Sequence, residues 1–147
     1  MINYSCGFLF DEKQRHVVLL QKGKPDWMKG KWNGIGGKIE PNETAYEAMV
    51  REFKEEAGLE IKDWEQFLVL TDNKNFQVNF FKAFVHLSKL HEVRTMETEK
   101  VAIHTVSYIL NQREVASSYI SNVPWLIRMA ITYDPYVAQY HITQVAT

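Results

Sequence analysis

The sequence predicts an α/β (α+β) protein in which a mixed β-sheet is packed by helices. Apolar runs typical of strands occur both before and after one strongly helical stretch, and hairpin-length turns connect them. The chain has 147 residues, of which 46% are hydrophobic, and this suits one domain with one core. We therefore expect residues 1–147 to form a single domain.

The N-terminal part is expected to be β-structure interrupted by loops. Residues 2–10 and 16–21 are predicted to be two strands joined by the polar turn 11–15. Residues 22–31 are predicted to form a loop, because they contain three residues that break regular structure, Gly23, Pro25 and Gly30. Glycines punctuate residues 32–39, which predicts a short strand with bulges.

One helix is predicted to start near Thr44 and to end at Gly58. Thr44 and Glu47 fit a capping box, in which each side chain accepts a hydrogen bond from the backbone of the other residue. An apolar stripe at spacings of three and four follows, formed by Ala45, Ala48, Met49 and Phe53. Gly58 suits the left-handed position that closes a helix.

The C-terminal half is expected to return to strands and to add short helices. In chain order we expect strands at 64–70 and 76–87, a polar loop at 88–99, a strand at 101–106, helices at 107–115 and 124–133, and a strand at 136–145. Pro124 suits the first turn of the second helix. Three tryptophans are expected to pack in the core, Trp32, Trp64 and Trp125.

Bulk properties exclude several partners and locations. A net charge of -1 offers no broad basic face, so we expect no nucleic-acid polymer as a partner. The single cysteine, Cys6, cannot form an internal disulfide, which fits a reducing interior. No signal peptide or membrane-spanning run is visible, so we expect a cytoplasmic protein without membrane contact. None of these properties indicates an oligomeric state.

The most specific pattern runs from Gly37 to Leu59 and reads GKIEPNETAYEAMVREFKEEAGL. Its fixed positions follow G-x5-E-x7-R-E-Φ-x-E-E-x-G-Φ, where Φ is apolar. On a helix, Glu52, Glu55 and Glu56 lie at i, i+3 and i+4, so their carboxylates point to one side. Such close carboxylates repel one another and their pKa values rise, unless a divalent cation such as Mg²⁺ or Mn²⁺ compensates them.

Two other residues of the pattern have physical roles of their own. Arg51 can reach Glu47 or Glu55, each four residues away, and orient a carboxylate beside the metal. A glycine has no side chain, so the Gly37 carbonyl can approach a metal closely. We therefore predict a metal site rather than a solvated acidic helix face, with Gly37, Glu52, Glu55 and Glu56 as its residues.

The pattern resembles the Nudix box, the signature of hydrolases that cleave nucleoside diphosphates linked to another group. The resemblance implies a Nudix-type α/β/α sandwich with a mixed sheet, in which the box forms a loop, a helix and a loop. It also implies Mg²⁺ (or Mn²⁺) as cofactor, and Glu52 and Glu56 match metal ligands of the family. Glu52, Glu55 and Arg51 are the candidate catalytic residues.

The general base varies among members of this family. We assign it to Glu52, while Glu55 or an acid outside the box remains open. Glu97 and Glu99, in the loop before a predicted strand, are the candidates for such an outer acid. Lys38 follows the box glycine and is a candidate for binding phosphate oxygens. Lys22 and Lys24 could do the same, but we interpret them as ordinary solvated lysines.

Residues outside the box indicate the base. The segment KWNGIGGK is similar to the corresponding part of MutT-type 8-oxo-dGTP diphosphatases, where an asparagine at the place of Asn33 hydrogen-bonds a purine edge. An amide donates and accepts at once, which suits an oxopurine. Trp27 stands where that group carries a stacking aromatic. Asn122 lies in a segment similar to one that closes the base pocket there, although the animal enzymes favour acids at that place; it could instead cap the helix that follows.

The resemblance implies a nucleoside triphosphate pyrophosphohydrolase that forms a nucleoside monophosphate and pyrophosphate. An oxidised purine nucleotide such as 8-oxo-dGTP is the leading substrate. Another nucleoside diphosphate-linked compound, such as a dinucleoside polyphosphate or a nucleotide sugar, is the alternative. A non-catalytic nucleotide-sensing module usually has a degraded box, and an isopentenyl diphosphate isomerase needs a cysteine at its site, whereas Cys6 lies far upstream of the box.

Overall fold

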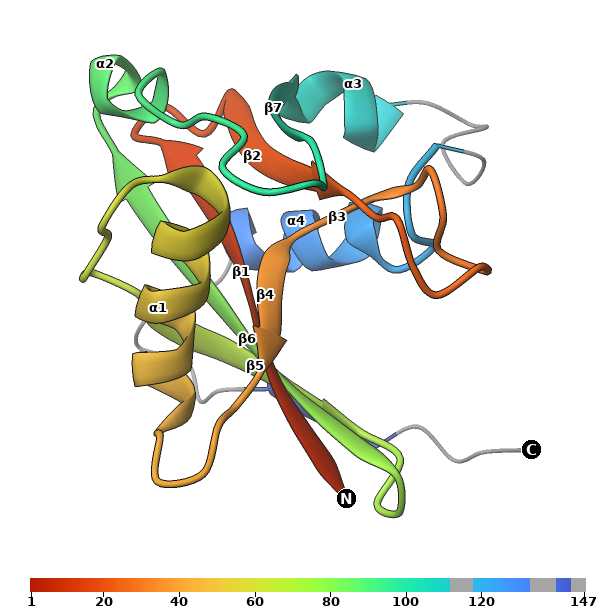
Figure 1. Ribbon diagram of the computed structural model, residues 1–147. Coiled ribbons are helices and arrows are strands. Elements are labelled where there is room, and N and C mark those ends of the chain that lie inside the picture. Colours follow the sequence, from red (N-terminus) through yellow and green to blue (C-terminus); the bar gives the residue numbers. More distant parts are fainter. Residues whose placement is uncertain (112–117, 133–139, 144–147) are drawn as a thin grey trace.

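The computed structural model describes residues 1–111, 118–132 and 140–143 (Figure 1). Within them the strands are β1 (Ile2–Asp11), β2 (His16–Gln21), β3 (Trp32–Asn33), β4 (Ile35–Lys38), β5 (Glu65–Thr71), β6 (Phe76–Val85), β7 (Val101–Thr105) and β8 (Tyr140–Thr143). They form one sheet with the order β3-β2-β1-β6-β5-β8, in which β4 also pairs with β1 and β7 with β2.

Strand β1 organises the sheet, because it uses both of its edges along most of its length. On one edge it is antiparallel to β4 near Tyr4 and to β2 near Leu9. On the other edge it is parallel to β6, from Ile2 opposite Phe76 to Asp11 opposite Val85. Strand β5 is antiparallel to β6 and parallel to β8. The sheet is therefore mixed, as predicted.

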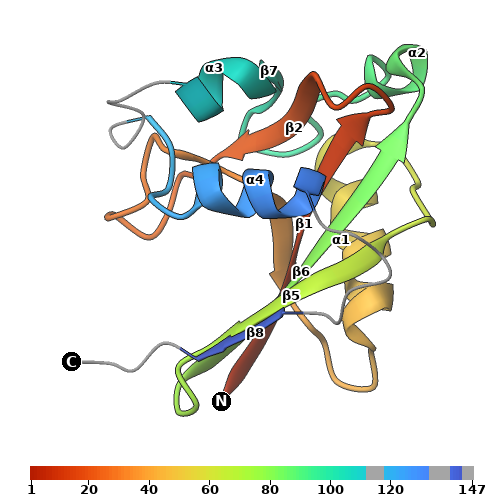
Figure 2. The same cartoon turned by 180° about the vertical axis from the view of Figure 1, so that it is seen from behind.

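The helices cover both faces of the sheet. They are α1 (Ala45–Ala57), α2 (Leu87–Leu90), α3 (Val106–Asn111) and α4 (Val123–Thr132). Helix α1 lies in front of the sheet in Figure 1, and α4 lies in front in Figure 2, which shows the opposite face. Phe8 and Phe10 of β1 belong to the cluster that packs on α4, and Leu9 belongs to the cluster that packs on α1. This alternation builds the predicted α/β/α sandwich.

Several boundaries differ from the predictions. The predicted strand at 32–39 is interrupted at Gly34, because β3 pairs with β2 whereas β4 pairs with β1. The predicted strand at 76–87 ends at Val85, since the His86 side chain accepts a hydrogen bond from the Ser88 N–H and caps α2. This helix begins at Leu87 and continues into the predicted loop.

The C-terminal elements agree in kind with the predictions where they are described. Helix α3 begins at Val106, one residue before the predicted start, and residues 112–115 lie outside the described part. Helix α4 begins at Val123 and keeps Pro124 in its first turn. Strand β8 covers the middle of the predicted strand at 136–145. Among the described helices, none has both the length and the apolar character needed to cross a membrane.

Candidate functional site

Helix α1 is fixed at both ends by its own sequence. Thr44 Oγ1 accepts a hydrogen bond from the Glu47 N–H at 3.0 Å, and the Glu47 carboxylate accepts one from the Thr44 N–H at 3.1 Å. Gly58 closes the helix with φ 73°, in the left-handed region. Both predicted caps are confirmed. A buried apolar face anchors the helix to the sheet, so its charged residues keep a fixed direction.

Arg51 lies at the centre of a group of carboxylates, Glu43, Glu52, Glu55 and Glu56, which we call the carboxylate cluster. Its Nε and Nη2 donate to the two oxygens of Glu43 at 2.6 and 2.8 Å, a bidentate pair. Its Nη1 donates to Glu52 Oε1 at 2.9 Å and to Glu55 Oε2 at 3.3 Å. The hydrogen bonds from Arg51 lower the pKa of Glu43. Arg51 thus sets the direction of the Glu52 carboxylate.

Glu47 is not the partner of Arg51, contrary to one of the two predicted pairings. Its carboxylate accepts the Thr44 N–H in the capping box, whereas the predicted contact between Arg51 and Glu55 is present. Glu43, to which the sequence reasoning assigned no role, makes the shortest contacts with Arg51. The fixed position of Glu43 in the pattern could have identified this role. The loop before α1 folds so that Glu43 lies against Arg51 of the helix.

Glu52 and Glu56 form the buried part of the carboxylate cluster. The Glu52 carboxylate lies so close to Gly37 that a side-chain carbon on Gly37 would overlap it. Glu56 is 9% exposed, and its Oε2 has no hydrogen-bond partner among the described residues. Burial, followed by the charge of Glu52, raises the pKa of Glu56 to about 8. Burial also raises the pKa of Glu52. Without a compensating cation, ionisation of both carboxyls is therefore unfavourable here.

The other predicted acids have different surroundings. The Glu55 side chain is 49% exposed and contacts Arg51. Glu97 is exposed in the loop before β7. Glu99, in the same loop, is partly buried, and its Oε2 accepts a hydrogen bond from the Gly23 N–H at 2.5 Å. The two outer acids are therefore not equivalent.

The loop that carries these outer acids is attached to the C-terminal end of α1 (Figure 1). The Arg94 N–H donates to the Ala57 carbonyl at 3.1 Å, and the Met96 N–H donates to the Glu56 carbonyl at 3.2 Å. These bonds satisfy carbonyls that have no partner within the helix. The outer acids stand near Glu56 as a result, and their charges add to the burial and the Glu52 charge that raise its pKa.

The carboxylate cluster fits a divalent cation by the chemistry of its donors. Within residues 1–111, 118–132 and 140–143, no three His, Cys, Asp or Glu side chains are gathered closely enough to hold a metal ion. Arg51 already binds Glu52 Oε1, and the buried oxygen of the cluster that has no partner among the described residues is Oε2 of Glu56. Oxygen donors from Glu52, Glu56 and the Gly37 backbone are the kind that Mg²⁺ and Mn²⁺ prefer.

A second group of residues is assembled around Trp32. Its N–H donates to the Ser118 carbonyl at 2.9 Å, and its carbonyl accepts a hydrogen bond from the Ile120 N–H at 3.0 Å. Residues 118–120 therefore run parallel to β3 beside Trp32. This pairing connects the segment that ends in Asn122 to the strand that contains Asn33.

Asn33 and Asn122, which we call the amide pair, offer complementary groups. Asn33 Oδ1 accepts a hydrogen bond from the Gly34 N–H at 2.8 Å, which leaves the amide nitrogen as a donor. Asn122 Oδ1 is buried and has no partner in the part of the chain that the structure describes. One donor and one unsatisfied acceptor are what recognition of a base edge needs.

Two residues that the sequence reasoning missed hold the 118–122 segment in place. The Tyr119 hydroxyl lies 2.8 Å from His104 Nδ1, and Tyr119 is 3% exposed. The His104 ring meets Trp32 edge-on, with centroids 4.4 Å apart. Burial lowers the pKa of His104, so a neutral Nδ1 can accept a hydrogen bond from the Tyr119 hydroxyl. Neither residue belongs to a recognisable sequence pattern.

The remaining predicted residues lie at the surface. Trp27 is 65% exposed on the loop 22–31, and Lys24 and Lys38 are exposed as well. Trp125 is 38% exposed, so its predicted place in the core is wrong, because the buried stripe of α4 runs through Val123, Leu126, Ile127 and Ala130. Trp64 is buried as predicted, and Trp32 packs partly buried against the core.

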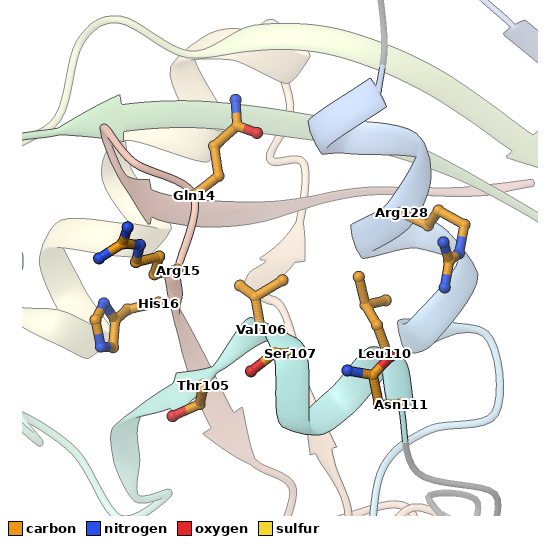
Figure 3. A pocket seen from close by; sticks show the side chains of 9 residues that line it. All are labelled: Gln14, Arg15, His16, Thr105, Val106, Ser107, Leu110, Asn111 and Arg128. Atoms are coloured by element: carbon orange, nitrogen blue, oxygen red, sulfur yellow. The ribbon is translucent and has the colours of Figure 1, made fainter.

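A cavity of about 510 Å³ lies elsewhere, between the β1–β2 turn, α3 and α4 (Figure 3). Its lining residues are Gln14, Arg15, His16, Thr105, Val106, Ser107, Leu110, Asn111 and Arg128. Arg15 and His16 extend to one side of the view, away from Asn111 and Arg128. The cavity therefore does not gather its polar groups at one point, and no predicted site residue is among the described residues that line it.

The fold agrees with comparisons to known proteins. The family model described as NUDIX domain matches residues 4–125. The solved structure of the MutT protein from Bacillus halodurans superposes with a TM-score of 0.67 at 23% sequence identity, covering 91% of this chain and 84% of that one. This likeness confirms the predicted fold class.

Two curated relatives share shorter stretches. The 8-oxo-dGTP diphosphatase of Proteus vulgaris is 35% identical over 60 residues, which are 41% of this chain and 53% of that protein. The oxidized purine nucleoside triphosphate hydrolase of Danio rerio is 48% identical over 44 residues, 30% of this chain and 28% of that protein. The alignments thus span about half, or less, of the length of these relatives.

Proposed function

Because this chain belongs to the Nudix family, we propose that it is a divalent-cation-dependent nucleoside triphosphate pyrophosphohydrolase. The reaction converts a nucleoside triphosphate and water into a nucleoside monophosphate and pyrophosphate. An oxidised purine nucleotide such as 8-oxo-dGTP is the proposed substrate, and residues 1–147 act as one domain. The single cysteine suggests that the protein works in a reducing compartment such as the cytoplasm.

The observation that carries this proposal is the buried, unsatisfied Glu56 carboxylate beside Glu52. Folding has brought two carboxylates together out of water, and Glu56 Oε2 has no compensating partner among the described residues. An arrangement that destabilises the protein is typical of a binding site. Glu52, Glu56 and the Gly37 carbonyl would hold Mg²⁺ or Mn²⁺, with Glu55 at the exposed margin.

The chain's own residues then orient the reaction. When bound, the cation would neutralise charge on phosphate oxygens and lower the pKa of a water molecule. Arg51 holds Glu52 through Oε1, so Glu52 Oε2 is available to accept a proton from water. Burial raises the pKa of Glu52 toward the range in which a general base works best. Lys38, which follows Gly37, is placed in sequence to meet phosphate oxygens.

Support for a purine substrate comes from the amide pair. The Asn33 amide nitrogen can donate to a carbonyl oxygen of the base, and Asn122 Oδ1 can accept from a ring or exocyclic N–H. An oxidised guanine carries both kinds of group. The names of the two curated relatives, which refer to 8-oxo-dGTP and to oxidised purine triphosphates, point to the same class.

The test is a nucleotide panel with purified protein and Mg²⁺, in which kcat/KM is compared for 8-oxo-dGTP, dGTP and other triphosphates. Phosphate and pyrophosphate are measured separately. We expect pyrophosphate as the product and a higher kcat/KM for 8-oxo-dGTP than for dGTP. Equal values for the two guanines would remove the oxidised-purine assignment, and absence of pyrophosphate from every triphosphate would overturn the proposed reaction.

A further inference from the structure

The Glu99 carboxylate connects two loops that are far apart in the sequence. Its Oε2 accepts a hydrogen bond from the Gly23 N–H at 2.5 Å, and Lys22 Nζ lies 3.8 Å from the same oxygen. The Lys22 side chain is 22% exposed and that of Glu99 is 23% exposed, so both groups are largely shielded from water. A hydrogen bond from a backbone N–H to an ionised carboxylate is shorter and stronger than one between neutral groups.

The loop 22–31, which carries Trp27, is otherwise closed largely on itself. The Lys22 N–H donates to the Lys31 carbonyl at 2.8 Å, and the Gly30 N–H donates to the Lys22 carbonyl at 2.8 Å. Met28 packs against the α4-side core. These contacts fix the shape of the loop and attach Met28 to the core. The contact with Glu99 instead attaches the first residues of the loop to the segment that is bonded to the end of α1.

On its other side, the loop that contains Glu99 is attached to α1. Backbone bonds from Arg94 and Met96 reach the carbonyls of Ala57 and Glu56, the last residues of that helix. Glu56 is also the residue with the buried oxygen that lacks a partner in the described part. These hydrogen bonds, together with the chain segment 96–99, therefore connect α1 through Glu99 to the beginning of the loop 22–31.

We propose that Glu99 is a positioning residue that holds the loop 22–31 against the carboxylate cluster and so places Trp27 for stacking on the nucleobase. This inference rests on the proposed function for its substrate. It separates the two outer acids: Glu99 is committed to Gly23 and Lys22, while the exposed Glu97 is the one available to reach water or a cation at the site.

The decisive experiment combines two substitutions of Glu99 with Trp27→Ala. Glu99→Gln keeps an oxygen that can accept the Gly23 N–H, whereas Glu99→Ala removes it. We expect Glu99→Ala to raise KM for the best nucleotide about tenfold, within the range of one lost base-stacking contact, while kcat changes by less than about twofold. Glu99→Gln should stay close to the wild type in both constants.

Coupling with Trp27 distinguishes positioning from catalysis. If Glu99 acts through the loop, adding Glu99→Ala to Trp27→Ala raises KM little further, because the stacking residue is already absent. If Glu99→Ala and Glu99→Gln instead lower kcat equally, or if the effects of Glu99→Ala and Trp27→Ala on KM multiply, the inference is overturned and Glu99 acts on the reacting groups.

Hydrogen exchange at the Gly23 amide tests the same contact without any nucleotide. Glu99→Ala should accelerate this exchange at least about tenfold, since the amide loses its acceptor. The matched control is Glu97→Ala in the same loop, which should leave exchange at Gly23 unchanged. Unaltered exchange in Glu99→Ala would contradict the inference. If the wild-type protein neither binds nor hydrolyses nucleotides, the proposed function fails, while this measurement still decides whether Glu99 holds the loop.

Discussion

The carboxylate cluster and the amide pair are built in different ways. The cluster comes from one short stretch of sequence, in which the loop before α1 and the helix itself supply Glu43, Arg51, Glu52 and Glu56. The amide pair lies on β3 and on a segment almost ninety residues later, and His104 of β7 contacts the aromatic residue of each, Trp32 and Tyr119. Local geometry positions the first group, and tertiary packing positions the second.

The two groups also differ in which of their oxygen atoms have hydrogen-bond partners. In the cluster, Arg51 binds three carboxylates and leaves one buried oxygen of Glu56 without a partner among the described residues. In the amide pair, Asn33 satisfies a neighbouring backbone N–H, while the Asn122 oxygen has no partner in that same described part. Each group thus retains one buried oxygen without a partner among the described residues, an ionisable carboxyl oxygen in the cluster and a neutral amide oxygen in the amide pair. We expect the carboxyl group to govern turnover and the amide group to govern the choice of base.

The largest effect should come from Glu52→Gln. Removing the ionisable carboxylate should lower kcat about 10²- to 10⁴-fold, the range for loss of a general base. Pyrophosphate release under saturating nucleotide and Mg²⁺ measures this effect, and circular dichroism checks that the fold is retained. Retention of full turnover would indicate that another acid, Glu55 or Glu97, accepts the proton.

Glu56→Gln should change the pH dependence of stability in metal-free protein. The Glu56 carboxyl has a pKa of about 8 when folded and 4.5 in its ordinary state, so between these values the folded protein binds a proton that the unfolded chain releases. Stability should therefore fall as pH rises through this window, by up to about 1.4 kcal/mol per pH unit from this group. The glutamine variant lacks this component.

Urea unfolding in EDTA at pH 5, 6.5 and 8 measures the difference between wild type and variant. The stability gained by Glu56→Gln should grow with pH across the three conditions. A gain that is constant with pH would mean that Glu56 titrates alike in both states, and the idea of an uncompensated buried carboxylate would then fail.

Asn122→Ala should alter selectivity with little change in stability. No hydrogen bond within the described residues is lost, so the free energy of unfolding should change by less than about 0.5 kcal/mol. The kcat/KM for the preferred purine should fall about tenfold to a hundredfold, the effect of one lost polar contact. Pyrimidine triphosphates serve as the control, because their values should move much less. An equal decrease for all bases would refute a base-reading role.

The smallest effect is expected from Tyr119→Phe. This change removes the hydroxyl that contacts His104 and keeps the aromatic packing. One neutral hydrogen bond contributes about 1 kcal/mol, which for a chain of this size lowers Tm by about 3 °C. Calorimetry measures the shift. If kcat stays constant while the ratio of kcat/KM between 8-oxo-dGTP and dGTP decreases, the separation of the amide pair from the carboxylate cluster is supported. A fall in kcat would contradict this separation.

The contrast between local geometry and tertiary packing also explains which features could be predicted from the sequence. The capping box, the apolar stripe and the side of α1 that carries the carboxylates follow from helical spacing, so they were predicted correctly. Spacing alone could not decide which carboxylate Arg51 prefers. Glu47 and Glu55 are equally distant along the chain, but the cap uses Glu47 and a folded loop supplies Glu43.

Other features could not be predicted because they depend on which strand or side chain lies next to a residue in the folded protein. The interruption at Gly34 depends on two different partner strands, β2 and β1, which no local pattern in residues 32–39 encodes. The exposure of Trp125 depends on which stripe of α4 faces the sheet. The contact between His104 and Tyr119 needs the pairing of residues 118–120 with Trp32 to exist first. Sequence reasoning proposed Asn33 and Asn122 through the family resemblance, and it gave no indication of the contacts that position them.

The parallel pairing of β1 with β6 also has a consequence for how the protein is made. At a synthesis rate of about 5–20 residues per second, roughly 4 to 15 seconds pass between the appearance of β1 and that of residue 76. During this time the apolar residues Phe8, Leu9 and Phe10 can pair with β2 but lack their second neighbour. We therefore expect these apolar residues to stay exposed along one edge of β1 on the nascent chain until β6 is synthesised.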